Sequence, residues 1–175
     1  RAYNETVART IRDGGGFVAK FMGDGVLAYF GYPQATEDAA ERAVRTTLRV
    51  IVAIKALPTV GERPLAVRAG VATGPVVVGD IVGDDIAREV NVVGETPNLA
   101  ARLLTVAEPN EVVIADSTRR LVGDLFRLRS LGSRFLKGID APTEIWAVLD
   151  DRSVVSRFEA VRNTRRSQFV GRGQE

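Results

Sequence analysis

The chain has 175 residues, 45% of them hydrophobic and 26% charged, which is the composition of a globular protein with room for one well-cored domain and a tail. It contains no cysteine and no histidine, so disulfides, thiolate or imidazole metal sites and histidine-dependent triads are excluded. Any catalysis must use carboxylates, Lys, Arg, Asn or hydroxyls, together with metals bound through oxygen.

The small net charge of +2 belongs to the end of the chain, where six Arg stand against three acids from Asp151 onward. The preceding part is near neutral, and no aromatic residues are interleaved with basic ones as on a nucleic-acid surface. No apolar run is long enough to cross a membrane, and no signal peptide opens the sequence. We expect a cytoplasmic domain with no nucleic-acid partner and no membrane segment.

The first element is an amphipathic helix. Tyr3, Val7 and Ile11 recur every four residues, which predicts a helix over residues 1–13 that ends at the glycines after it. No helix start signal precedes Arg1, so we expect the sequence to open inside this helix, with part of the domain upstream.

Two apolar runs follow, residues 17–22 and 26–30, joined by Gly-Asp-Gly. An Asp-Gly pair supplies the positive φ of a tight turn, so we predict a β-hairpin. Both arms are apolar on nearly every residue, which predicts strands covered on both faces in the middle of a sheet. Lys20 and Asp24 break this pattern. They can be a solvent-exposed lysine and a turn residue, or they can carry chemistry.

The next helix is predicted to start at a Thr36 cap, to carry an apolar stripe as far as residue 54 and to end before Pro58. Its other side has two pairs of opposite charge at i,i+4 spacing, Asp38 with Arg42 and Glu41 with Arg45. We interpret these pairs as a solvated face.

A stronger helix start follows residue 94, with Thr96 as the predicted cap and Pro97 at the first helical position. Asn98 and Arg102 lie four residues apart, so they share one face near the N-terminal end, where free amides attract anions. From the spacing alone, Asn98 can equally extend the cap and Arg102 can be a surface residue.

The remaining pattern is one of short strands, predicted at residues 65–73, 75–78, 90–93, 111–115, 126–131 and 144–149, with a short helix from Asp116 to residue 122. The acidic segment 79–89 lacks the spacing of an EF-hand, so we interpret it as an arm or interface loop. Strands alternating with helices, and one hairpin, predict an α+β domain built on one mixed or antiparallel sheet with helices packed on a face.

Four motifs stand in order along this pattern: KFMGDGVLAYFG, GVATGPVVVGDIVG, VVGETPNLAARL and LKG. Together they resemble the class III nucleotide cyclase catalytic domain over residues 1–149. The resemblance implies a ferredoxin-like fold that lacks its first strand in this sequence, and a head-to-tail homodimer with active sites in the seam. Residues 150–175 are expected to be a basic linker or tail. Its SRFEA and FVGR resemble the junction at which some bacterial cyclase domains lead into a nucleotide-binding ATPase module.

The resemblance also implies a reaction, the conversion of ATP to 3′,5′-cyclic AMP and pyrophosphate with two Mg²⁺ or Mn²⁺ ions, in signal transduction. The residues that it assigns are one metal ligand, Asp24; the purine readers Lys20 and Asn91; Lys137, which holds the terminal phosphates; and the catalytic pair Asn98 and Arg102, which orients the ribose and stabilises charge on the α-phosphate.

Two departures from the family pattern leave alternatives open. The first metal aspartate of the family lies in an upstream motif like FxDxxGFT, which nothing here matches. Asn91 stands where adenylate cyclases often have Asp or Thr, and an amide can present either its oxygen or its NH₂ to a base, so it discriminates purines less firmly. The alternatives are a guanylate cyclase, and a degenerate domain that dimerises or binds nucleotide to regulate an attached ATPase.

Overall fold

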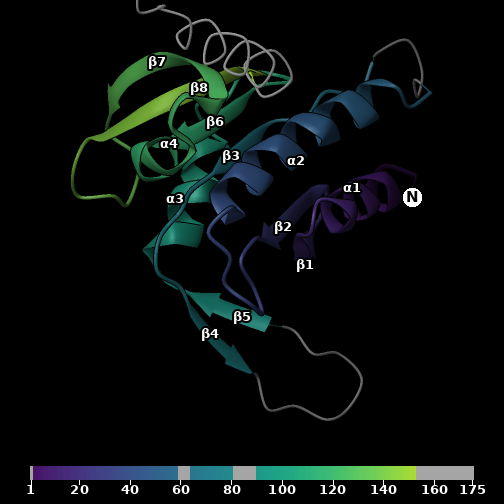
Figure 1. Cartoon of the computed structure of the whole chain (residues 1–175), viewed down its shortest axis with the longest axis horizontal. Coiled ribbons are helices and arrows are strands. Elements are labelled where there is room, and N and C mark those ends of the chain that lie inside the picture. The colour runs from purple at the N-terminus through teal and green to yellow at the C-terminus, as the bar shows by residue number, and fades with distance from the viewer. Residues whose placement is uncertain (1, 59–63, 81–89, 153–175) are drawn as a thin grey trace, which may run out of the picture.

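Helices are separated along the chain by groups of one to three strands (Figure 1). The computed structural model describes residues 2–58, 64–80 and 90–152, with the backbone alone for 78–80 and 90–93. The elements are α1 (Ala2–Asp13), β1 (Phe17–Met22), β2 (Gly25–Tyr29), α2 (Ala39–Lys55), β3 (Ala69–Val71), β4 (Val77–Asp80), β5 (Val90–Val93), α3 (Glu95–Leu103), β6 (Val112–Ala115), α4 (Asp116–Val122), the 3₁₀ turn η1 (Gly123–Leu125), β7 (Phe126–Arg134) and β8 (Thr143–Asp151). No helix among these residues is long and apolar enough to span a bilayer.

The strands confirm an α+β fold but do not form one sheet within the described residues. Four of them make a mixed sheet in the order β3-β6-β8-β7, in which β3 and β6 are parallel and the other pairs antiparallel. β1 pairs with β2, and β4 with β5, as two separate antiparallel ribbons. The β4–β5 ribbon extends away from the rest of the domain (Figure 1).

The four-stranded sheet is covered on both faces, where we expected helices on one. Alternate residues of a strand point to opposite faces, and β6 shows this division clearly. Val112 and Ile114 pack with residues of α2 and α4, whereas Val113 and Ala115 pack with Leu103 of α3. The sheet therefore separates α2 and α4 from α3.

The β1–β2 hairpin packs on α1 and α2. Its apolar residues Val18, Val26 and Phe30 adjoin a cluster that includes Val7 and Ile54. Within the part of the chain that the structure describes, the hairpin is only half-covered, because its strands pair there only with each other and the distal half of β1 is exposed. Our expectation of strands covered on both faces is therefore wrong for this chain.

The hairpin turn differs in detail from the prediction. Met22 pairs with Gly25, so the turn consists of Gly23 and Asp24. The positive φ of 64° belongs to Gly23, the residue before Asp24, and not to the glycine after it. Glycine at the first central position is typical of a type II′ turn, which suits the twist of a hairpin.

The start of α2 also differs. The helix begins at Ala39 with Asp38 at the N-cap, and no side chain caps it. Thr36 is not the cap, since its hydroxyl accepts a hydrogen bond of 2.6 Å from Nη2 of Arg42 instead. The i,i+4 pairs of this helix form as expected, with Arg42 Nε 3.2 Å from Oδ1 of Asp38 and Arg45 bound to Glu41.

Candidate functional site

The tip of the β1–β2 hairpin carries the first two predicted site residues. A β-bulge between Val18 and Lys20 shifts the register of β1, so that Lys20 pairs with Leu27. Bulges re-aim side chains next to functional sites. Lys20 and Asp24 are both exposed, as are the neighbouring Phe21 and Met22.

Asp24 acts electrostatically on α1. Burial, and after it the negative charge of Asp24, raises the pKa of Tyr3 above its ordinary value. The sequence alone gave no sign of this relation, because the two residues lie in different elements. It places the carboxylate of Asp24 near the beginning of α1.

A two-ion metal site needs several oxygen ligands, and the described residues do not group them. Asp24 is a single carboxylate at an exposed turn. No set of three or more carboxylates lies close enough in the described residues to hold a metal ion. The described residues of one chain therefore do not supply a complete set of acidic ligands for such a site.

α3 carries the second pair, Asn98 and Arg102, one turn apart. Asn98 is exposed and Arg102 half-buried, and neither side chain makes a hydrogen bond or ion pair within the described residues. By contrast, the half-buried Arg42 and Arg45 each contact carboxylates. A half-buried guanidinium without an acidic partner is able to bind an anion, because a charge partly removed from water is stabilised by an opposite charge.

Two contacts position α3 against the preceding strand and loop. A Cβ at Gly70 of β3 would lie 2.9 Å from Cβ of Leu103 and against the carbonyl oxygen of Ala100, so only glycine fits there. At its other end, α3 begins at Glu95 with Gly94 at the N-cap. The predicted cap, Thr96, does not cap the helix; its Oγ1 donates a hydrogen bond of 3.0 Å to the carbonyl oxygen of Pro75.

The other two predicted residues lie at separate places. The backbone of Asn91 pairs with Gly79 in the β4–β5 ribbon, and its side chain falls outside the described part. Lys137 is exposed in the turn after β7, beside the buried Leu136. Gly138 closes this turn with a φ of 78°. Of the acidic segment predicted as a loop over residues 79–89, residues 79–80 belong to β4, and residues 81–89 lie outside the described part of the chain.

The candidate residues divide into two groups by packing. Lys20 and Asp24 extend from the hairpin that packs on α1 and α2. Asn98 and Arg102 belong to α3, which packs on the opposite face of the four-stranded sheet. The fold thus confirms the element on which each of these residues stands, and it assigns the two pairs to different layers of one chain.

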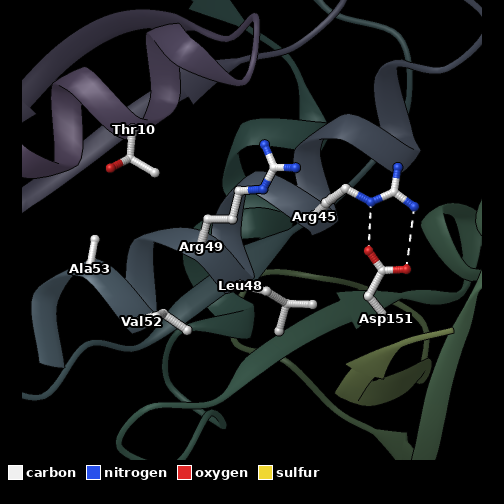
Figure 2. A pocket seen from close by; sticks show the side chains of 7 residues that line it. All are labelled: Thr10, Arg45, Leu48, Arg49, Val52, Ala53 and Asp151. Carbon is white, nitrogen blue, oxygen red and sulfur yellow. Dashed lines mark hydrogen bonds and ion pairs between the residues drawn. The ribbon is translucent and has the colours of Figure 1, made fainter. Parts of the chain in front are cut away.

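A pocket of about 510 Å³ lies elsewhere, between α1, α2 and the end of β8 (Figure 2). It is lined by residues that are mostly apolar or basic, Thr10, Arg45, Leu48, Arg49, Val52, Ala53 and Asp151. None of these is a predicted site residue. The pocket offers no unpaired carboxylate, because its one acid is bound to Arg45.

Arg45 and Asp151 form a two-point contact at the rim of this pocket (Figure 2). Arg45 Nε donates to Oδ2 at 2.6 Å and Nη2 to Oδ1 at 3.3 Å. This hydrogen bonding raises the pKa of Arg45 above its ordinary value. We expected Arg45 to lie on a solvated face, but it connects α2 to the end of β8 and stacks 5.7 Å from the Phe126 ring centre.

Comparison with known proteins agrees with this fold. Residues 8–149 match the family model described as the adenylate and guanylate cyclase catalytic domain. An uncharacterised protein of Rhizobium meliloti (strain 1021) is 32% identical over 160 residues, which is 91% of this chain but 16% of that protein. The chain therefore spans a small part of that relative.

Two solved structures are also similar. The guanylate cyclase domain of RhGC from Catenaria anguillulae, in complex with GTP, has a TM-score of 0.78 at 25% identity, over 86% of this chain and 81% of that one. The adenylyl cyclase CyaB from P. aeruginosa has a TM-score of 0.77 at 28% identity, over 86% and 80% of the two chains. Both kinds of cyclase thus share the fold.

Proposed function

The chain belongs to the family of adenylate and guanylate cyclase catalytic domains, and we propose that it forms 3′,5′-cyclic AMP and pyrophosphate from ATP in signal transduction. Its similarity to the adenylyl cyclase CyaB supports a cyclase reaction, and its similarity to a guanylate cyclase domain makes GTP the competing substrate. The choice of ATP depends on the residues at the hairpin and β5.

The observation that carries the proposal is the state of Arg102. Its guanidinium is half-buried, shares a face of α3 with Asn98 and has no partner within the described residues. A planar cation of this kind suits the oxygens of a phosphate. We expected Arg102 near the N-terminal end of the helix, but it lies in the last turn of α3, so the free amides of the first turn are nearer to Asn98 than to Arg102. We assign Arg102 to the α-phosphate and Asn98 to the ribose.

The reaction is an internal displacement. The 3′-oxygen of the ribose forms a bond with the α-phosphorus, the bond from that phosphorus to pyrophosphate breaks, and the 3′-hydroxyl releases its proton. Negative charge grows on the phosphate oxygens as this happens. Arg102 stabilises that charge, Asn98 aims the hydroxyl, and Lys137 holds the departing phosphates; one preorganised donor of this kind contributes about 3 kcal/mol in other enzymes.

The base is read by Lys20 and Asn91 in this proposal. A lysine ammonium can donate to N1 of adenine, whereas N1 of guanine carries a hydrogen and presents a donor to a donor. Lysine can reach O6 of guanine if the base shifts, and the amide of Asn91 can turn to suit. We therefore expect a preference for ATP and not an absolute choice.

Divalent ions belong to the proposal as cofactors. Class III domains use them, and Mg²⁺ or Mn²⁺ would activate the 3′-hydroxyl and neutralise phosphate charge. Asp24 can supply one carboxylate oxygen. Asp24 needs further ligands beside it, since the described residues contain no group of three or more acidic side chains that could hold a metal ion.

A head-to-tail homodimer is the proposed assembly. The hairpin that carries Asp24 lies in a different layer from Asn98 and Arg102, so a second chain can bring Asp24 of one copy to α3 of the other, while Lys20 of the same hairpin serves the opposite site. Exposed apolar side chains near the candidate residues support an interface: Phe21 is 44%, Met22 52% and Val77 71% exposed.

The test is to identify the products of the full-length protein. With MnATP we expect cyclic AMP and pyrophosphate in equal amounts. Asp24→Asn should lower kcat by about a hundredfold or more while the fold stays intact, because Asn suits the turn but is a poor metal ligand. Asp124→Asn, in the exposed η1 turn, is the matched control and should leave kcat unchanged.

A second candidate function is a degenerate cyclase domain, because the described residues of one chain do not supply a complete set of acidic metal ligands. A degenerate domain would bind nucleotide or dimerise without turnover and regulate an attached ATPase. Nucleotide binding with no cyclic product from either ATP or GTP would overturn the enzyme proposal in favour of this one.

A further inference from the structure

Thr96 joins α3 to the loop that leads from β3 to β4. Its Oγ1 donates a hydrogen bond of 3.0 Å to the carbonyl oxygen of Pro75. Thr96 is the second residue of α3, whereas Pro75 lies 21 positions earlier in the chain. The hydroxyl that we expected to cap the helix is therefore used to connect two segments.

The packing around this hydrogen bond is close on both sides. A Cβ at Gly74 would lie 2.6 Å from Oγ1 of Thr96, so the hydroxyl occupies the space that a side chain at position 74 would need. A Cβ at Gly94 would lie 3.4 Å from the same Pro75 oxygen. The loop and the start of the helix thus fit each other through two glycines and one hydroxyl.

This junction is also where the β4–β5 ribbon leaves the domain. Val77 opens β4 and pairs with Val93, the last residue of β5, and α3 begins two residues later. The ribbon carries Asn91, and α3 carries Asn98 and Arg102. The position of Asn91 relative to Asn98 and Arg102 therefore depends on this junction.

We propose that Thr96 is a positioning residue for the cyclase site: its hydroxyl fixes the first turn of α3 against Pro75 and so sets Asn98 and Arg102 relative to the β4–β5 ribbon. This role rests on the proposed function. Thr96 itself is assigned no contact with substrate. Small misplacements of groups that act in the transition state lower kcat strongly, so the effect should appear there.

The test uses two substitutions at the same position. Thr96→Val keeps the shape of the side chain and removes the donor, whereas Thr96→Ser keeps the donor. We expect Thr96→Val to lower kcat roughly tenfold to a hundredfold with KM within about threefold, and Thr96→Ser to restore kcat to within about threefold of wild type. Thr47→Val is the matched control, because the Thr47 hydroxyl also donates to a carbonyl, that of Ala43 within α2 at 2.7 Å, away from the site.

A second readout does not depend on turnover. Hydrogen exchange of the backbone amides in residues 94–104 should rise in Thr96→Val and stay near wild type in Thr96→Ser and Thr47→Val. If the wild-type protein makes no cyclic nucleotide, the proposed function fails. The hydrogen-exchange measurement then still shows whether the Thr96 hydroxyl fixes the first turn of α3. Unchanged kcat and unchanged exchange in Thr96→Val, or an equal loss in Thr96→Ser, would overturn the role of the hydroxyl.

Discussion

Arg45 binds Asp151 through two nitrogens, at 2.6 and 3.3 Å, across 106 positions of sequence. Each side chain is 22% exposed, so the pair is largely removed from water. The contact joins the middle of α2 to the last residue of β8, beside which Arg152 N donates to Leu125 O at 2.8 Å. It therefore secures the end of β8 against α2.

Asp151→Asn should reduce the free energy of unfolding by about 1 to 3 kcal/mol, because it leaves the largely buried guanidinium of Arg45 with Glu41 as its one acidic partner among the described residues. Asp150→Asn is the matched control. Its pair with Arg127 is about half exposed, so its loss should cost under about 1 kcal/mol. Urea unfolding of both variants measures the difference, and equal losses would contradict the structural weight given to Asp151.

A second prediction concerns the charge of Asp24. Asp24→Asn should lower the pKa of Tyr3, because it removes a negative charge that opposes tyrosinate, yet the pKa should stay above the ordinary value since burial is the larger cause. Tyrosinate absorbance against pH, compared with Tyr3→Phe, measures this. Because burial and Asp24 disfavour tyrosinate, the free energy of unfolding should fall as pH rises above the ordinary tyrosine pKa of 10.0 and through the raised pKa of Tyr3.

The control for Asp24 is Asp13→Asn at the far end of α1, which should not move the Tyr3 titration. An unchanged pKa of Tyr3 in Asp24→Asn would show that the hairpin tip does not face the beginning of α1.

Base selection gives a third prediction. Wild type should prefer MnATP to MnGTP in kcat/KM by about tenfold to a hundredfold, which corresponds to the ~1 to 3 kcal/mol cost of an unpaired polar group in a partly desolvated pocket. Lys20→Glu should reduce or reverse that ratio, because a carboxylate accepts from N1–H of guanine. Lys55→Glu reverses a charge at the exposed end of α2 and should leave the ratio unchanged. Equal use of both nucleotides by wild type would remove Lys20 from the purine site.

Sequence patterns predicted the elements well where glycine, proline and periodicity act locally. The hairpin around Asp24 and the helix that carries Asn98 and Arg102 are both confirmed. The predicted helix caps were wrong for a shared reason, since the hydroxyl of Thr36 accepts from the side chain of Arg42, and that of Thr96 donates to the carbonyl oxygen of Pro75. Neither hydroxyl caps its helix. A cap pattern indicates that a hydroxyl is able to bind a backbone amide of its own helix. It does not show whether the folded chain brings a competing hydrogen-bond partner to that hydroxyl.

Contacts between residues far apart in the sequence could not be predicted from local sequence patterns. Asp151 follows Arg45 by 106 positions, and nothing in either local pattern indicates the pair. The apolar arms of the hairpin predicted strands that are buried on both faces. An apolar run indicates that burial is favourable, but it does not show whether the described part of the chain provides the elements that would bury it. Lys20 and Asn98 were predicted as site residues from their local motifs. Local motifs do not show how elements pack, so the sequence did not indicate that these two residues lie in different layers.

The complementation of two inactive variants tests the central claim most directly. If the hairpin of one copy completes α3 of another, Asp24→Asn and Arg102→Ala chains should each be inactive alone and should recover activity when mixed. Random pairing makes half of the dimers mixed, each with one intact site, so activity should reach about a quarter of wild type. No recovery, despite mixed dimers demonstrated with two affinity tags, would contradict a site shared between two chains.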